Sequence, residues 1–194
     1  APQEAIGYLH PLYCQSLSEF GRPRFLRNSG GWILEREIPN SQRLDAMGCY
    51  PLFACQDWSQ LHVDIVELQD ELVSLAIVTD PFGEYEPDYL RHCFPDRVVP
   101  FKEHMVTDLS RAPESFVSGH HRRNARKALD RLSIELCEDA TLFADEWTNL
   151  YAGLVKRHNI HGLTAFSAKS FRTQLAVPGM SMFRATDGDE TVGM

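Results

Sequence analysis

An uninterrupted apolar run at residues 72–79 (LVSLAIVT) is the feature of this sequence that most constrains its fold. The run is rich in Val and Leu, and it is too short to cross a bilayer. It ends at Asp80-Pro81-Phe82-Gly83, a strong turn sequence. We therefore expect a central strand that is buried on both faces, within a sheet covered by helices.

Apolar periodicity predicts helices and strands on both sides of this run. Before the run, residues 21–31 lack such a pattern and are expected to form a loop that carries Arg22, Arg24 and Arg27. A helix that begins after Asp57 is expected to be acidic on its solvent face. The remaining predictions in this half are helices at 4–20 and 87–93 and strands at 32–38, 47–54 and 98–109.

The last third of the chain gives the clearest local signals. A helix is predicted from Ser115 or Ser118 to about Arg131, and an amphipathic helix from Thr141 to about Asn159. The sequence Asp187-Gly188-Asp189 is typical of a hairpin turn. A shorter helix is predicted to end near residue 175. Strands are predicted at 133–138, at 180–186 and from 191 onward.

Composition narrows the possible functions. The chain has 194 residues and a formal net charge of -8. This negative charge does not favour a protein that binds the phosphate backbone of nucleic acids or recognises a particular nucleic-acid sequence. Its five cysteines form no CxxC pair, and no His lies at zinc-finger spacing from them. We therefore expect buried, reduced thiols in a cytoplasmic protein, with no metal site.

Sequence motifs of other enzyme classes are also missing. The chain contains neither the GxSxG sequence of many serine hydrolases nor the GxxxxGK[ST] phosphate-binding loop. No charged and then apolar leader opens the sequence, and we expect no association with membranes.

The densest group of charged residues lies in the predicted helix after Ser118. On a helix, Arg122 stacks on Arg126 and Arg123 stacks on Lys127. Cations beside the unpaired N–H groups of a helix start favour a phosphate or carboxylate ligand. The alternative is a solvated basic face that pairs with the acidic helix at 64–71, and the sequence favours neither.

Two histidines are candidate proton acceptors, because the reference pKa of imidazole lies near neutrality. His158 follows Arg157 at the end of the predicted helix 141–159, and His121 lies beside the basic residues. For the end of that helix the simpler interpretation is that its cations complement the helix dipole.

Three sequence features together resemble a known superfamily. The basic segment Arg122-Arg123-Asn124-Ala125-Arg126-Lys127-Ala128 precedes a strand, and it is followed by Arg157-His158-Asn159-Ile160 and by Phe166-Ser167-Ala168-Lys169-Ser170-Phe171. With the strand–helix–helix–strand–strand order, these resemble the GNAT acyltransferases, and in particular the double-GNAT branch that includes FemA/FemB-like aminoacyltransferases. The resemblance covers about the last 80 residues.

This resemblance implies an α/β (α+β) protein with a GNAT-like mixed sheet flanked by helices. It divides the chain into an N-terminal GNAT-like half at 1–115, a basic connecting helix at 116–132 and the first part of a C-terminal half at 133–194. The whole protein is then expected to transfer an acyl group from acyl-CoA, a co-substrate rather than a bound cofactor, to a small-molecule or peptide amine. Arg122, Arg123, Arg126, Lys127 and Arg157 are the implied ligand contacts, and His158 or His121 the implied proton acceptor.

The sequence departs from the GNAT pattern at one motif. The R/Q-x-x-G-x-G/A turn, which binds the pyrophosphate of acyl-CoA in that superfamily, does not occur. We expect the second half to be incomplete at Met194, inactive alone, and able to form a homodimer through its open sheet edge. The alternative function is a non-catalytic binding or scaffold module, whose basic patch docks an anionic partner.

Overall fold

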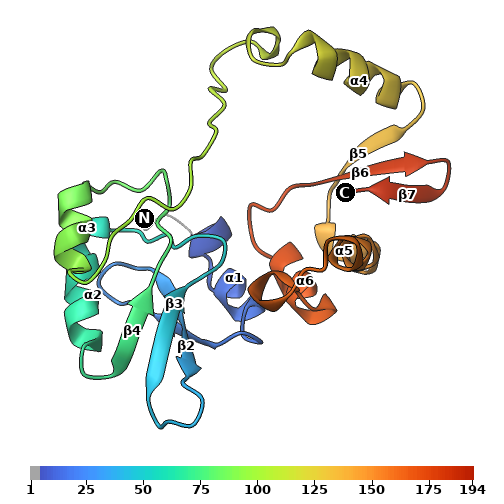
Figure 1. The fold of residues 1–194 in the computed structure, drawn as a ribbon. Coiled ribbons are helices and arrows are strands. Elements are labelled where there is room, and N and C mark those ends of the chain that lie inside the picture. The colour runs from blue at the N-terminus through green and yellow to red at the C-terminus, as the bar shows by residue number, and fades with distance from the viewer. Residues whose placement is uncertain (1–4) are drawn as a thin grey trace.

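A computed structural model describes residues 5–194 as a mixed α/β protein with two sheets flanked by helices (Figure 1). The first sheet has the order β1-β2-β3-β4, with strands Arg22–Phe25, Trp32–Glu37, Leu44–Gly48 and Leu72–Ala76. The first three strands are antiparallel, and β4 runs parallel to β3 after a crossover through α2, Leu61–Leu68. The second sheet has the order β5-β6-β7, all antiparallel, with strands Ser133–Cys137, Met182–Asp187 and Glu190–Gly193.

The other helices are arranged around these sheets. The α-helices are α1 (Pro11–Ser16), α3 (Pro87–Cys93), α4 (Gly119–Leu129), α5 (Ala144–His158) and α6 (Ala168–Leu175). Short 3-10 turns are η1 (Gly7–Leu9), η2 (Trp58–Gln60), η3 (Pro113–Ser115), η4 (Ala140–Phe143) and η5 (Gly162–Thr164). Within residues 5–194, no helix combines the length and the apolar character needed to cross a membrane.

The first sheet is covered on both faces. Ile33 packs with Leu61 and Leu68 of α2, whereas the next residue, Leu34, packs with Leu17 and the α1 residue Cys14. This alternation follows from the two-residue period of a strand, which sends neighbouring side chains to opposite faces. The result is two apolar layers that share β2 as their central strand.

The two halves of the molecule meet through α1 and α6 (Figure 1). Val177, which follows α6, is buried in the same cluster as Cys14 and Leu17. The N–H of Gly7 donates to the carbonyl of Pro178 at 3.3 Å. The C-terminal half therefore supplies part of the core that lies behind the first sheet.

Local signals explain why the C-terminal elements form as predicted. Ser167 caps α6 by accepting a hydrogen bond from the N–H of Ser170 at 3.1 Å. Asn159 ends α5 in the left-handed conformation, at φ 52°. Gly188, at φ 61°, allows the tight hairpin between β6 and β7. The strand–helix–helix–strand–strand order is thus confirmed, including the pairing of Thr191 in β7 with Thr186.

Two predictions for the first sheet are wrong. The apolar run at 72–79 forms β4 at the edge of the sheet rather than a strand buried on both faces, and Val73 is exposed. The segment at 21–31 contains β1 and is not all loop. In both cases the position depends on distant neighbours, which hydrophobic pattern alone does not identify.

The remaining differences concern the helix at 4–20 and the strands at 47–54 and 98–109. Residue 4 lies outside the described residues, and the rest of 4–20 forms η1 and α1 only. The second strand begins earlier, as β3. Residues 98–109 form no strand. This segment connects α3 to α4 and pairs with no strand of the described residues 5–194, and Met105 is 96% exposed.

Candidate functional site

Helix α4 carries four of the five predicted ligand-binding residues, Arg122, Arg123, Arg126 and Lys127. The Ser118 hydroxyl caps it by accepting a hydrogen bond from the N–H of His121 at 3.3 Å. No side chain of α4 is buried, and in Figure 1 the helix stands away from both sheets at the end of the long connection from α3. The face of the helix opposite its basic side chains therefore also faces solvent, since Ala125, Ala128 and Leu129 are exposed.

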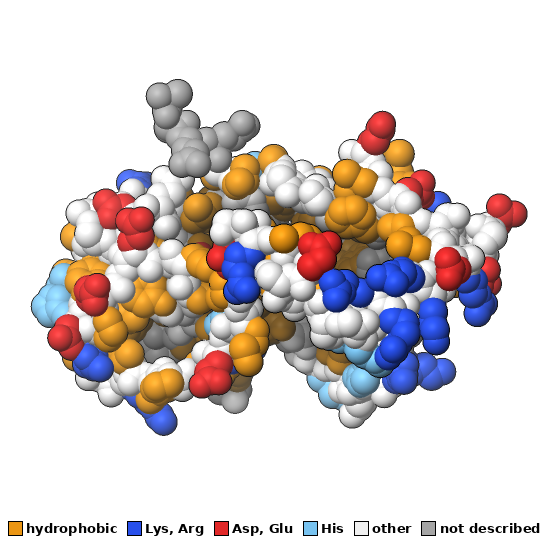
Figure 2. Space-filling model, turned by 90° about the horizontal axis from the view of Figure 1, so that it is seen from above, with side chains coloured by type: hydrophobic (Ala, Val, Ile, Leu, Met, Phe, Trp, Pro, Cys, Tyr) orange, Lys and Arg blue, Asp and Glu red, His pale blue; other side chains and the backbone are white. Residues whose placement is uncertain are grey.

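The basic side chains of α4 lie together on the surface. Figure 2 shows Lys and Arg gathered on the side of the molecule where α4 lies. Among residues 5–194, none of the ion pairs involves Arg122, Arg123, Arg126 or Lys127. Arg131, just beyond the helix, is paired with Asp187 of β6. We call the four unpaired cations the α4 basic patch.

The charge of this patch contrasts with the rest of the protein. Residues 116–132 contain five cationic and one acidic side chain, a formal charge of +4, whereas the whole chain carries -8. The remaining residues therefore carry -12. Since surface charges act over about 10 Å at ordinary salt, the patch attracts anions although the whole molecule repels them.

The acidic helix is not the partner of this patch. The Asp64 carboxylate is buried and accepts hydrogen bonds from the N–H groups of Asn28 (3.0 Å) and Ser29 (2.7 Å). Glu71 is paired with Arg24. The alternative in which the basic helix pairs with the helix at 64–71 is therefore wrong, and the patch remains open to an external ligand.

The two candidate proton acceptors lie on different helices. His121 is exposed on α4, on the helix face that also carries Ala125 and opposite the basic patch. His158 and Arg157 are exposed in the last turn of α5, where their position suits a cation that complements the helix dipole. The structure thus places His121 on the same helix as the four cations but on its opposite face, and leaves His158 and Arg157 on a separate element.

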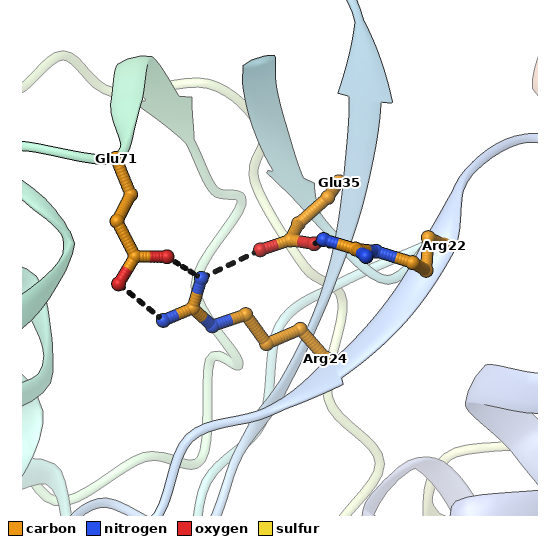
Figure 3. A network of polar contacts seen from close by, with 4 residues as sticks. All are labelled: Arg22, Arg24, Glu35 and Glu71. Carbon is orange, nitrogen blue, oxygen red and sulfur yellow. Dashed lines mark hydrogen bonds and ion pairs between the residues drawn. The ribbon is translucent and has the colours of Figure 1, made fainter.

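A second polar site was missed by the sequence analysis. Glu35 of β2 is 2% exposed and accepts hydrogen bonds from Arg22 (Nε, 2.8 Å) and Arg24 (Nη1, 2.7 Å), both in β1 (Figure 3). Arg24 also binds the Glu71 carboxylate, through Nη2 at 3.2 Å. The hydrogen bonds to Glu71 and Glu35 raise the pKa of Arg24, and those from Arg24 lower the pKa of Glu71. The four side chains form a continuous network in which cationic and acidic groups alternate, in the order Arg22, Glu35, Arg24 and Glu71. It links β1 and β2 to the residue before β4.

One signal for this network was present in the sequence. Arg22 and Arg24 are two residues apart, so on a strand they lie on the same face. The register of β1 and β2 places Arg22 opposite Glu35. A hairpin prediction for 22–37 would have identified the pair, but residues 21–31 lack the apolar periodicity that predicts a strand.

A cavity of about 620 Å³ lies beside this network, between β1 and α2. A smaller one of about 330 Å³ lies between α5 and the β6–β7 hairpin. In the smaller cavity, Arg184 donates to Glu146 and Thr191 and lies 5.0 Å from the ring centre of Phe143. Neither cavity is lined by α4 or by His158.

The five cysteines, all within the described residues, are free thiols and buried, as predicted. Burial raises the pKa of Cys55 to about 12, so its thiol stays protonated at neutral pH. Within residues 5–194, no group of three or more His, Cys, Asp or Glu side chains is arranged to hold a metal ion.

Comparison of the chain with protein-family models, with curated proteins and with solved structures found no match.

Proposed function

We propose that this chain is part of a cytoplasmic acyltransferase, in which the α4 basic patch binds the phosphates of an acyl-CoA donor. The observation that carries the proposal is a set of four cations on one short helix of an acidic protein: none has an ion-pair partner within residues 5–194, three are exposed and Arg122 is half-buried. Guanidinium groups suit phosphate because their planar donors can form two parallel hydrogen bonds with it. Acyl-CoA then acts as a co-substrate, and the acceptor is an amine.

The order of elements after α4 supports this assignment. Strand β5, helices α5 and α6 and the β6–β7 hairpin follow the order that the resemblance to GNAT acyltransferases implies. In the N-terminal half, the connection from β3 to α2 contains no glycine, so a glycine-rich phosphate turn does not form there. The phosphate contacts are accordingly assigned to α4. The open edge of β7 is proposed to pair with a second copy of the chain.

Transfer of an acyl group from a thioester to an amine needs few catalytic groups from the protein. The amine nitrogen attacks the thioester carbonyl, a C–N bond forms, the C–S bond breaks, and the thiol leaves with the proton that the amine gives up. Of the two candidate proton acceptors the proposal assigns the role to His121, which shares α4 with the patch, whereas His158 lies on α5. The cations of α4 hold the donor in position.

Calorimetric titration with acetyl-CoA tests the proposal. We expect saturable binding that weakens as salt is raised, and the double substitution Arg122→Ala/Arg126→Ala should weaken it about tenfold by removing two phosphate contacts. Lys169→Ala is the matched control, since Lys169 is an exposed cation on helix α6 and lies outside the patch. Unchanged affinity in the double variant would refute the role of α4.

One observation favours the alternative of a non-catalytic module. An isolated helix of 11 residues is marginal in water, and α4 buries no side chain, so a docked partner would stabilise it. Polyglutamate is a suitable probe for an acidic partner. Binding of polyglutamate through the patch, without any binding of acetyl-CoA, would replace the acyltransferase with this module.

A further inference from the structure

The larger cavity provides a binding site that is separate from α4. It lies between the edge strand β1 and helix α2, and its volume of about 620 Å³ is typical of small-molecule sites. Two buried leucines, Leu26 and Leu68, line it, and the ring of Phe25 is half-exposed beside them. The other lining residues are Pro23, Arg24, Arg27, Asp64, Glu67 and Glu71. We call this cavity the β1–α2 cleft.

The two walls of the cleft have opposite charge. Arg24 and Arg27 come from β1 and the residues after it, whereas Asp64 and Glu67 come from α2. Arg24 is already paired with Glu35 and Glu71. In the described part of the chain, Arg27 and Glu67 have no ion-pair partner, and both are exposed at the cleft. One cation and one carboxylate are therefore free, each on its own wall.

Asp64 strengthens the negative wall. Its carboxylate is buried, and its three hydrogen-bond donors are neutral: the N–H and side-chain amide of Asn28 and the N–H of Ser29. These three hydrogen bonds compensate the burial of the carboxylate, which supplies a fixed negative charge at the α2 wall. Since neither Asp64 nor Glu67 has an ion-pair partner within residues 5–194, a cationic group in the cleft would be attracted to this wall.

We infer that the β1–α2 cleft binds an α-amino acid with an apolar side chain. The ammonium group of the ligand binds the exposed Glu67 carboxylate, near the buried charge of Asp64, and the ligand carboxylate binds the Arg27 guanidinium on the opposite wall. The apolar side chain covers the half-exposed ring of Phe25, which removes apolar surface from water. This inference does not depend on acyl transfer, because none of these residues belongs to α4.

Three related ligands separate the contributions of the two walls. Titration with L-leucine, L-leucine methyl ester and N-acetyl-L-leucine compares a zwitterion with forms that lack the carboxylate or the ammonium charge. We expect saturable binding of leucine and about tenfold weaker binding of each blocked form, since each loses one charge-assisted contact. Absence of saturable leucine binding at millimolar concentrations, or equal binding of all three, would overturn the inference.

Two exposed substitutions identify the residues without disturbing the fold. Glu67→Gln should weaken leucine binding about fivefold and reduce its preference over N-acetyl-L-leucine, and Arg27→Gln should do the same for its preference over the methyl ester. The matched controls are Asp70→Asn, just beyond α2, and Arg43→Gln, in the turn before β3; both are exposed and neither lines the cleft. Equal effects in test and control variants would count against the site. Acetyl-CoA titrations report on α4 separately, so the two proposals can fail independently.

Discussion

The two sheets of this molecule differ in how many of their faces are covered. In the four-stranded sheet, Ile33 and Leu34 are both fully buried, one on each face. In the three-stranded sheet, Cys137 and Met182 are buried toward the helices, while Leu136 and Phe183, which lie opposite each other on the other face, are 59% and 60% exposed. Burial on two faces removes more apolar area from water, so the first sheet should contribute most of the stability.

Truncating one leucine in each sheet is the strongest test of this difference. Leu34→Ala should lower the free energy of unfolding by about 3 kcal/mol, because it leaves a cavity between the first sheet and helix α1. Leu136→Ala should lower it by less than about 1 kcal/mol, because that side chain already contacts water. Urea unfolding followed by circular dichroism measures both values. Equal losses would mean that the second sheet is as tightly packed as the first.

Ion pairs provide a second test, with a somewhat smaller expected effect. Glu35 and Glu135 each bind an arginine across a strand pair, but their side chains are 2% and 54% exposed. Glu35→Gln should cost about 2–3 kcal/mol, since two guanidinium groups lose their buried counter-ion, whereas Glu135→Gln should cost about 0.5 kcal/mol or less. The same unfolding experiment serves, and a larger cost at Glu135 would contradict the burial argument.

The smallest expected effect is on how the free energy of unfolding changes at acidic pH. Hydrogen bonds from Arg24 hold the pKa of Glu71 below its ordinary value of 4.5. As the pH falls, Glu71 is therefore protonated in the unfolded chain before it is protonated in the folded protein. The ion pair thus contributes fully to the free energy of unfolding above pH 4.5, and this contribution is lost as the pH falls below 4.5. In Glu71→Gln, unfolding free energies measured at about pH 6 to 3 should decline less steeply than in the unmodified protein. Asp70→Asn is the neighbouring control, and an equal change in slope there would remove Glu71 as the cause.

Sequence patterns predicted the elements with strong local signals. The Ser167 cap and the Asp187-Gly188-Asp189 turn specify structure within a few residues, and α6 and the β6–β7 hairpin agree with the prediction. The amphipathic helix predicted from Thr141 begins later, as α5 at Ala144, because residues 140–143 form the 3-10 turn η4. The basic helix was also predicted closely, because Ser118 and the charged residues that follow lie in one segment. For these elements, capping and periodicity were sufficient.

Features that depend on distant residues could not be predicted in this way. Whether residues 72–79 lie at the centre or the edge of a sheet depends on which strands pair with them. Residues 98–109 alternate apolar and polar side chains like a strand, but within residues 5–194 no strand pairs with them. The same limit applies to the β1–α2 cleft. Arg24 and Glu71 are 47 residues apart, and only the crossover through α2 brings them together.

The contact between α1 and α6 has a consequence for the integrity of the molecule. Residues 94–118 are the covalent connection between the two sheets, yet Val177 packs with Cys14 and Leu17 independently of that segment. A protease that cleaves the exposed connection would separate the chain into two fragments without removing this interface. The fragments are thus expected to co-purify, so the protein offers a natural division point for a split reporter.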